Sequence, residues 1–241
     1  MKRGIVDYFK NFGKNKLSNI FLLGFLVVSI FEIIGEYNEN KTLVWVTKPL
    51  IIPLLTAYYL IVSQKINQLF IVALAFNWIA NLLFIQNTFQ FIVYGVLFFV
   101  IYRILVIYIV VNKVKMPSPI PLIIGCIPFA FIYMSVTIFT YNALGNGVYL
   151  FLLQGIFTIF LGGFSLGNYI MDSNKSNSLL LISTLFMAFN QFVFLLKLYY
   201  QQVNMLQAFA MLLFIAGQLL LTLYMFNTEK NVRKTEPIKT K

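Results

Sequence analysis

The amides and charged side chains inside apolar stretches are the residues whose types and spacing could do chemistry. Asn77 and Asn81 interrupt the stretch at 70–86, FIVALAFNWIANLLFIQ, four residues apart. On a helix this spacing puts both amides on one face. A lipid-facing amide leaves donors and acceptors unpaired in hydrocarbon, so this face is predicted to point into the protein and line a polar site.

Four ionisable residues also fall inside apolar stretches, namely Glu32, Lys48, Arg103 and Lys197. A charge in a membrane span is costly and by default marks a functional site. Arg103 stands near the middle of its stretch, where a guanidinium needs a partner or a water-filled cavity. The amides that accompany them are Asn77, Asn81, Gln154, Asn168, Asn190, Gln191 and Gln218.

Each of these residues also has a purely structural interpretation. Lys48 and Lys197 could extend their ammonium groups to the membrane interface. Asn77, Asn81 and Asn190 could serve as hydrogen-bonding contacts between helices. Arg103 could be paired with Glu32 or with backbone carbonyls. The sequence leaves these alternatives open.

The composition indicates an integral membrane protein. Of 241 residues, 60% are hydrophobic and 10% are charged, against about 45–50% and about 25% in soluble domains. The chain has no histidine and a single cysteine, Cys126, so it lacks the commonest metal ligand and the means for an internal disulfide. We therefore expect no metal site and no cofactor. The net charge of +11 lies mostly in the termini and short loops, which indicates membrane orientation rather than nucleic-acid binding.

The elements that must position these residues are eight apolar runs, each long enough to span a bilayer. The predicted fold is an all-α bundle of eight transmembrane helices, with an acidic loop Glu36–Glu39 after the first. We expect a basic cytoplasmic segment at 1–16 that lies along the membrane, a transmembrane domain at 17–226 and a basic cytoplasmic tail at 227–241. The predicted spans cover about 17–34, 43–62, 70–86, 89–111, 120–139, 147–171, 178–200 and 205–226.

The distribution of basic residues predicts the orientation. Of the 18 lysines and arginines, 14 fall on the side of the two termini, and the loops of the other side hold only Lys41. Both termini are therefore predicted to be cytoplasmic in a multi-pass protein of the cell membrane. Glu32, Lys48 and Lys197 then lie toward the non-cytoplasmic ends of their spans, and Arg103 and Asn190 lie near the midplane. These depths predict an outward-opening pocket with Arg103 at its floor.

The order of these residues resembles the YhhN-like family of multispan membrane proteins, which includes the lysoplasmalogenases. The second span begins Thr47-Lys48-Pro49-Leu50, like the TKPL start in the family. FNWIANLL at 76–83 is similar to a pattern like FSLLGDVL, and GVLFFVIYR at 95–103 to one like GLxSFLLAH. FMAFNQFVFLLKL at 186–198 is similar to FVISDSLLALNKF, with Lys197 on the family lysine, and Gln218-Leu219-Leu220 looks like the closing AQLL.

The resemblance implies a hydrolase that cleaves the vinyl ether of a lysoplasmalogen and releases an aldehyde. The positions of the family aspartates are Asn81 and Asn190 in this chain, and the position of the family histidine is Arg103. The reaction needs a proton for the vinyl group and a water to attack the resulting cation. Asparagine and arginine are poor acids and bases, and loss of one such group typically costs about 10²–10⁴ in rate. Glu32 is the candidate replacement acid.

Three functions follow from this reading. The first is hydrolysis of a lysoplasmalogen or a related lipid at the substituted family positions. The second is a lipid-binding protein without the hydrolysis, in which Arg103 and Lys48 hold an anionic lysolipid headgroup and Asn81 and Asn190 bond its polar groups. Asn77, Gln191 and Lys197 are the further predicted contacts. The third, a small transporter or a structural protein, ranks last because no inverted repeat or broken helix supports transport.

Overall fold

The computed structural model describes residues 16–86, 88–199 and 203–235. In this part of the chain, eight α-helices are long and apolar enough to cross a membrane. They are α2 (Lys16–Tyr37), α3 (Lys41–Val62), α4 (Gln68–Ile85), α5 (Phe89–Lys113), α6 (Pro119–Leu144), α7 (Val148–Met171), α8 (Lys175–Tyr199) and α9 (Asn204–Thr235), with the 3₁₀ turn η2 (Gly145–Gly147) between α6 and α7. The predicted all-α bundle of eight spans is confirmed, and the described residues form a multi-pass membrane protein.

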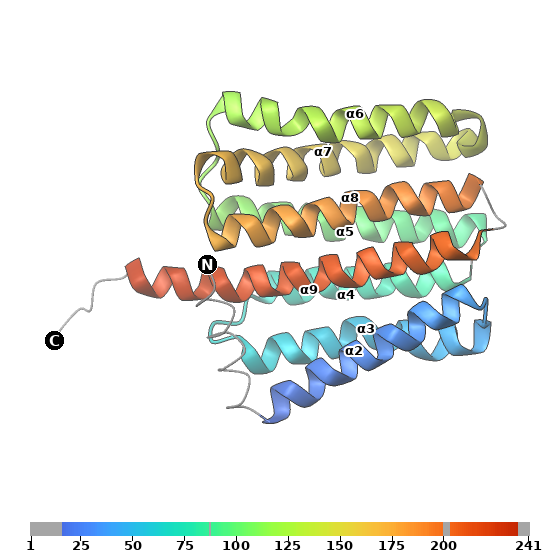
Figure 1. The fold of residues 1–241 in the computed structure, drawn as a ribbon, viewed down its shortest axis with the longest axis horizontal. Helices are drawn as coiled ribbons and strands as arrows, with labels where there is room; N and C mark the ends of the chain where they lie inside the picture. Colours follow the sequence, from blue (N-terminus) through green and yellow to red (C-terminus); the bar gives the residue numbers. More distant parts are fainter. Residues whose placement is uncertain (1–15, 87, 200–202, 236–241) are drawn as a thin grey trace.

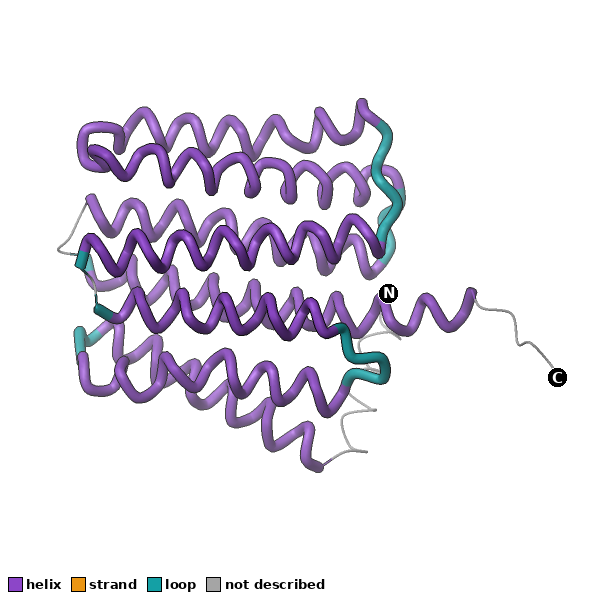
Figure 2. The backbone as a smooth tube through the Cα atoms, turned by 180° about the vertical axis from the view of Figure 1, so that it is seen from behind, coloured by secondary structure: helices purple, strands orange, loops and turns teal. Residues whose placement is uncertain are grey.

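The helices run along one common axis (Figure 1). Each helix packs most closely against its neighbour in sequence, in the pairs α2–α3, α4–α5, α6–α7 and α8–α9. The α2–α3 pair and the α6–α7 pair form opposite edges of the bundle, and the other four helices lie between them (Figures 1 and 2). The central helices therefore have protein on most sides, which is where polar side chains can be accommodated away from lipid.

The edges carry large apolar side chains on their outer surface. Phe131, Ile138 and Phe139 of α6 are 72%, 76% and 80% exposed. In water such a surface would be an association site, whereas in a bilayer it faces hydrocarbon.

The spans differ from the predicted ones at two ends. Glu36 lies within α2 and not in a loop, so the prediction of an acidic loop beginning there is wrong. The helix continues because the carboxylate of Glu36 is bonded by Lys48 of α3, which removes the need to expose it. At the other end, α9 runs as one helix to Thr235, so part of the tail predicted at 227–241 is helical. Most of the N-terminal segment predicted at 1–16 lies outside the described residues.

Proline shapes the helix that carries Lys48. Pro53 has no N–H, so the carbonyl of Pro49, one turn earlier in α3, loses its helical partner. The indole N–H of Trp78 on α4 donates to this carbonyl at 2.8 Å. An unpaired carbonyl is costly in an apolar interior, so this bond fixes α3 against α4 beside Lys48.

Candidate functional site

A polar cavity lies among six helices, α3, α4, α5, α7, α8 and α9. It has a volume of about 90 Å³, which is room for several water molecules since one needs about 10–15 Å³. Aromatic rings of Phe84, Phe99, Phe194 and Phe214 form much of its apolar wall. Its polar wall consists of Lys48, Asn81, Gln154, Asn190, Gln191 and Gln207.

The lining residues lie in the half of the bundle away from the two termini. Lys48 stands in the second turn of α3, Asn81 in the last turns of α4 and Gln207 in the first turn of α9. The loops that join these helices on that side are α2–α3, α4–α5 and α8–α9. The cavity therefore lies toward the end of the bundle that carries these loops.

Lys48 joins the cavity to two carboxylates of α2. Its side chain is 4% exposed, and its Nζ donates to Glu36 and lies 3.4 Å from Oε1 of Glu32. Thr47 donates to the other oxygen of Glu32. An ammonium held in this way does not extend to the membrane interface, so the interface alternative for Lys48 does not hold.

The carboxylates themselves differ in their relation to the cavity. Glu32 is fully buried against Thr47 and Lys48. Glu36 also accepts a hydrogen bond of 3.1 Å from Nε2 of Gln207, so it contacts two residues that line the cavity. Glu36 is thus the acid next to the cavity, although the predictions named Glu32 only.

Carboxylates accompany both ammonium groups of this cluster. Lys48 meets Glu32 and Glu36, and Lys197, which is half-buried, lies within electrostatic range of Glu36 and Glu39. The negative charges weaken the attraction of these lysines for an added anion.

Arg103 lies behind the cavity and has no such balance. Its side chain is 2% exposed on α5, and its Nη1 donates to Thr158 and, at 3.3 Å, to Oε1 of Gln191. The guanidinium carbon lies 5.3 Å from the ring centroid of Phe99, a cation–π contact. Gln191 and Phe99 both line the cavity.

The remaining donors of Arg103 lack partners. Nε and Nη2 are buried and make no hydrogen bond within the described chain. Over the same residues, the ion pairs found are those of Lys48 with Glu32 and Glu36. The alternative in which Arg103 pairs with Glu32 therefore does not hold. A buried unpaired donor costs about 1–3 kcal/mol, more when charged, and so calls for a ligand or water.

The two asparagines of α4 play different parts. Asn81 lines the cavity, and its Nδ2 donates to the backbone and side-chain oxygens of Asn77 at 2.8 and 3.1 Å. These bonds stay within one helix, so Asn81 does not act as a contact between helices. Asn77 is fully buried behind it, and its Nδ2 has no partner.

The structure brings together only some of the predicted site residues. Lys48, Asn81, Asn190 and Gln191 line one cavity, with Arg103 in contact with Gln191. Arg103 itself, Asn77, Glu32 and Lys197 are not among the lining residues.

Three polar residues of the site were not predicted: Glu36, Thr158 and Gln207. Two of them could have been found from spacing, because Glu36 follows Glu32 by four residues and Thr158 follows Gln154, an amide already singled out, by four. Gln154 and Thr158 both bond Gln191 across the α7–α8 interface. Gln207 stands near a helix end, where the sequence gives no signal of burial.

A family comparison can now be set beside this geometry. The model of the YhhN family matches residues 43–225, which is about three quarters of the chain. The chain belongs to the YhhN family. No curated protein and no solved structure matches it.

The YhhN match includes every residue that lines the cavity and excludes both carboxylates beside it. The lining residues run from Lys48 to Phe214, whereas Glu32 and Glu36 precede residue 43. Neither Asp, Glu nor His lines the cavity among the described residues. In these residues there is also no group of three or more His, Cys, Asp or Glu side chains that could hold a metal ion. The arrangement can thus bind and orient a polar group, and Lys48, bonded to Glu36 of α2, is the lining residue that could pass on a proton.

Proposed function

We propose that this YhhN-family protein binds a lysolipid and holds its anionic headgroup in the polar cavity, which opens toward the non-cytoplasmic side of the cell membrane. The observation that carries the proposal is Arg103, a buried cation with two unpaired nitrogens beside the cavity. Nε and Nη2 form one edge of the guanidinium, and such an edge binds two oxygens of a phosphate side by side.

The surrounding charges favour an anion at Arg103 rather than at Lys48. Lys48 is paired with Glu32 and Glu36, and Lys197 lies within electrostatic range of Glu36 and Glu39, so both attract an anionic headgroup more weakly than Arg103 does. Asn81 and Asn190 then offer amide groups to the glycerol of the lipid. The phenyl rings of the cavity wall suit the first carbons of its hydrocarbon chain.

Binding by the purified protein in vesicles tests this proposal. Arg103→Leu is expected to weaken binding of an anionic lysophospholipid about 10–100-fold, because hydrogen bonds to charged groups contribute about 1.5–3 kcal/mol. Binding of a neutral monoacylglycerol is expected to stay unchanged. Arg103→Lys keeps the charge without the two-donor edge, so it should fall between the two proteins. Equal losses for both lipids in Arg103→Leu would reject the proposal.

Hydrolysis of a lysoplasmalogen is the second candidate, favoured by the family and by the pair Glu32 and Glu36. A carboxylic acid there would have to protonate the vinyl ether, and water would then attack the cation to give the aldehyde. Glu36 contacts the lining residues Lys48 and Gln207. Among the described residues, it is the carboxyl group that bonds directly to two residues of the cavity lining.

Aldehyde release from a lysoplasmalogen separates the two candidates. The binding proposal predicts release no faster than from protein-free vesicles. Turnover that disappears in Glu36→Gln or Glu32→Gln would establish hydrolysis with an acid of α2. Turnover that survives both variants would point to catalysis by the lining residues Asn81 and Asn190 or by Arg103.

A further inference from the structure

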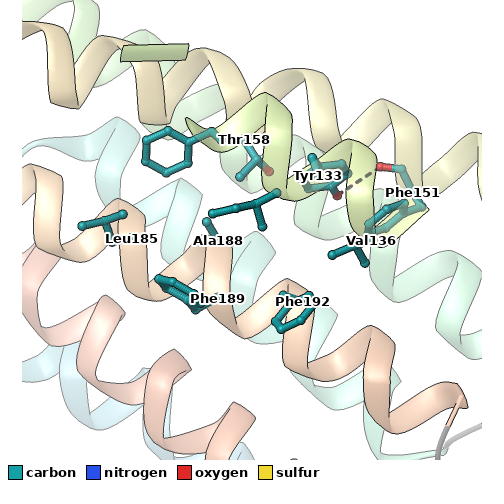
Figure 3. A pocket seen from close by; sticks show the side chains of 10 residues that line it. Tyr133, Val136, Phe151, Thr158, Leu185, Ala188, Phe189 and Phe192 are labelled. Carbon is teal, nitrogen blue, oxygen red and sulfur yellow. Dashed lines mark hydrogen bonds between the residues drawn. The ribbon is translucent and has the colours of Figure 1, made fainter. Parts of the chain in front are cut away.

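We infer that the hydrocarbon chain of the bound lysolipid leaves the cavity between α7 and α8 and lies in an apolar pocket formed by α6, α7 and α8. This inference rests on the proposed function and concerns a second part of the molecule. Figure 3 shows the pocket, with Ala188, Phe189 and Phe192 of α8 on one side and Thr158 of α7 across from them.

The size of the polar cavity requires the chain to leave it. Pockets that bury a whole drug-sized ligand measure about 300–1,000 Å³, and this cavity has about 90 Å³. It can hold a headgroup fragment, but not a long hydrocarbon chain as well. The chain must therefore pass between two of the surrounding helices.

Two bonded side chains, Thr158 and Gln191, join the cavity to the apolar pocket. Oγ1 of Thr158 lies 2.8 Å from Oε1 of Gln191; Thr158 lines the pocket and Gln191 lines the cavity. On α8 the two sites alternate, since Asn190 and Gln191 face the cavity and Phe189 and Phe192 face the pocket. A chain that begins in the cavity beside Asn190 therefore reaches the pocket within about one turn of α8.

The chemistry of the pocket suits hydrocarbon. Its tyrosine, Tyr133, is already satisfied, because its hydroxyl donates to the carbonyl of Phe151 at 3.1 Å and its ring stacks on the ring of Phe151 at 4.4 Å (Figure 3). An apolar occupant thus breaks no hydrogen bond of that residue. Phe189 is 43% exposed, so the pocket reaches the lipid-facing surface.

The pocket encloses only about 20 Å³, so a chain lying there keeps one side against membrane lipid. Such a half-open site accepts chains of different length, since the end of the chain continues into the bilayer.

Photolabelling tests the position of the chain. The probe is an anionic lysophospholipid with a diazirine in the first half of its chain, added to protein in vesicles, with excess unlabelled lysophospholipid as competitor. Competed labelling is expected on Phe129 and Tyr133 of α6 and on Phe189 and Phe192 of α8. Competed labelling confined to other helices would overturn the inference.

Two matched variants sharpen the result. Ala188→Phe fills the pocket and should reduce competed labelling at least fivefold, whereas Ala75→Phe, on an exposed position of α4, should leave it unchanged. Binding of a short-chain lysophospholipid should be the same in both variants. Equal labelling in the two variants would overturn the chain site and leave the headgroup site standing. Absence of competed labelling and of short-chain binding in the unsubstituted protein would overturn the proposed function itself.

Discussion

Lys48 of α3 is the one positive charge that pairs with both carboxylates of α2, Glu32 and Glu36, among the described residues. Its Nζ donates to Glu36 and lies 3.4 Å from Glu32, and Glu32 is fully buried. Breaking a buried ion pair from one side costs about 3–5 kcal/mol, since the remaining charge stays uncompensated. We therefore expect Lys48→Met to lower the free energy of unfolding by about that amount.

Unfolding in detergent, followed by circular dichroism, measures this loss. The double variant Lys48→Met, Glu32→Gln removes one of the stranded charges, so it should be more stable than Lys48→Met alone. A double variant that is less stable than either single variant would show that the carboxylate does not depend on Lys48.

Asn81 is the lining residue at which an acid for the proposed hydrolysis can be introduced most directly. Its Nδ2 donates to two oxygens of Asn77. A carboxyl group introduced by Asn81→Asp would face these acceptors, so it can bond them only while it keeps its proton. A protonated carboxyl beside the cavity is what a general acid requires.

We accordingly expect Asn81→Asp, combined with Asn190→Asp, to raise aldehyde release from a lysoplasmalogen about 10²-fold or more over the unsubstituted protein. Asn168→Asp, which also exchanges a buried amide of a span but lies outside the cavity lining, should have no such effect. An equal rise in both proteins would mean that the added carboxyls act without the cavity.

At the scale of single helices, the α6–α7 pair depends on glycines that let the backbones meet. Gly163 and Gly167 have the spacing that predicts close helix contact. A Cβ at Gly167 would lie 3.0 Å from the carbonyl oxygen of Pro121 and 3.2 Å from the amide nitrogen of Leu122. Both are backbone atoms, so α6 itself would have to move.

Gly167→Ala is therefore expected to destabilise the protein by about 1–3 kcal/mol, measured by thermal unfolding in detergent. Gly24→Ala is the matched control, because a Cβ there meets only Cδ2 of Leu54, at 3.8 Å. This substitution should leave stability unchanged or raise it slightly, since alanine favours a helix over glycine. Equal losses in both variants would point to helix propensity rather than to packing.

The helices were predictable from the sequence because hydrocarbon demands long apolar segments with internally bonded backbones. The ends of the helices were less predictable. α2 continues through Glu36, whose charge is met by Lys48 of another helix. The composition of the site was also only partly predictable. The amides and charges were visible as polar residues in apolar runs, but which of them converge depends on helix packing, and Thr158 looked like any threonine of a span.

For the whole molecule, the direction in which the bundle crosses the membrane determines which leaflet reaches the cavity. Residues 63–67, 114–118 and 172–174 connect the helices at the end of the bundle where α2 begins and α9 ends. Lys65 and Lys115 lie in these connections, and basic loops are retained on the cytoplasmic side. We therefore expect the cavity, which lies in the other half, to face the outer leaflet.

Cysteine labelling of intact cells measures this orientation, and the single Cys126 makes a clean background as Cys126→Ala. In this background, Asn38→Cys places a thiol at the exposed turn between α2 and α3, and Ser173→Cys places one at the exposed connection between α7 and α8. A membrane-impermeant maleimide should label the first in intact cells and the second only after permeabilisation. The reverse pattern would put the cavity in the cytoplasmic half and make an inner-leaflet lysolipid its ligand, because the ligand must enter from the leaflet that the cavity faces.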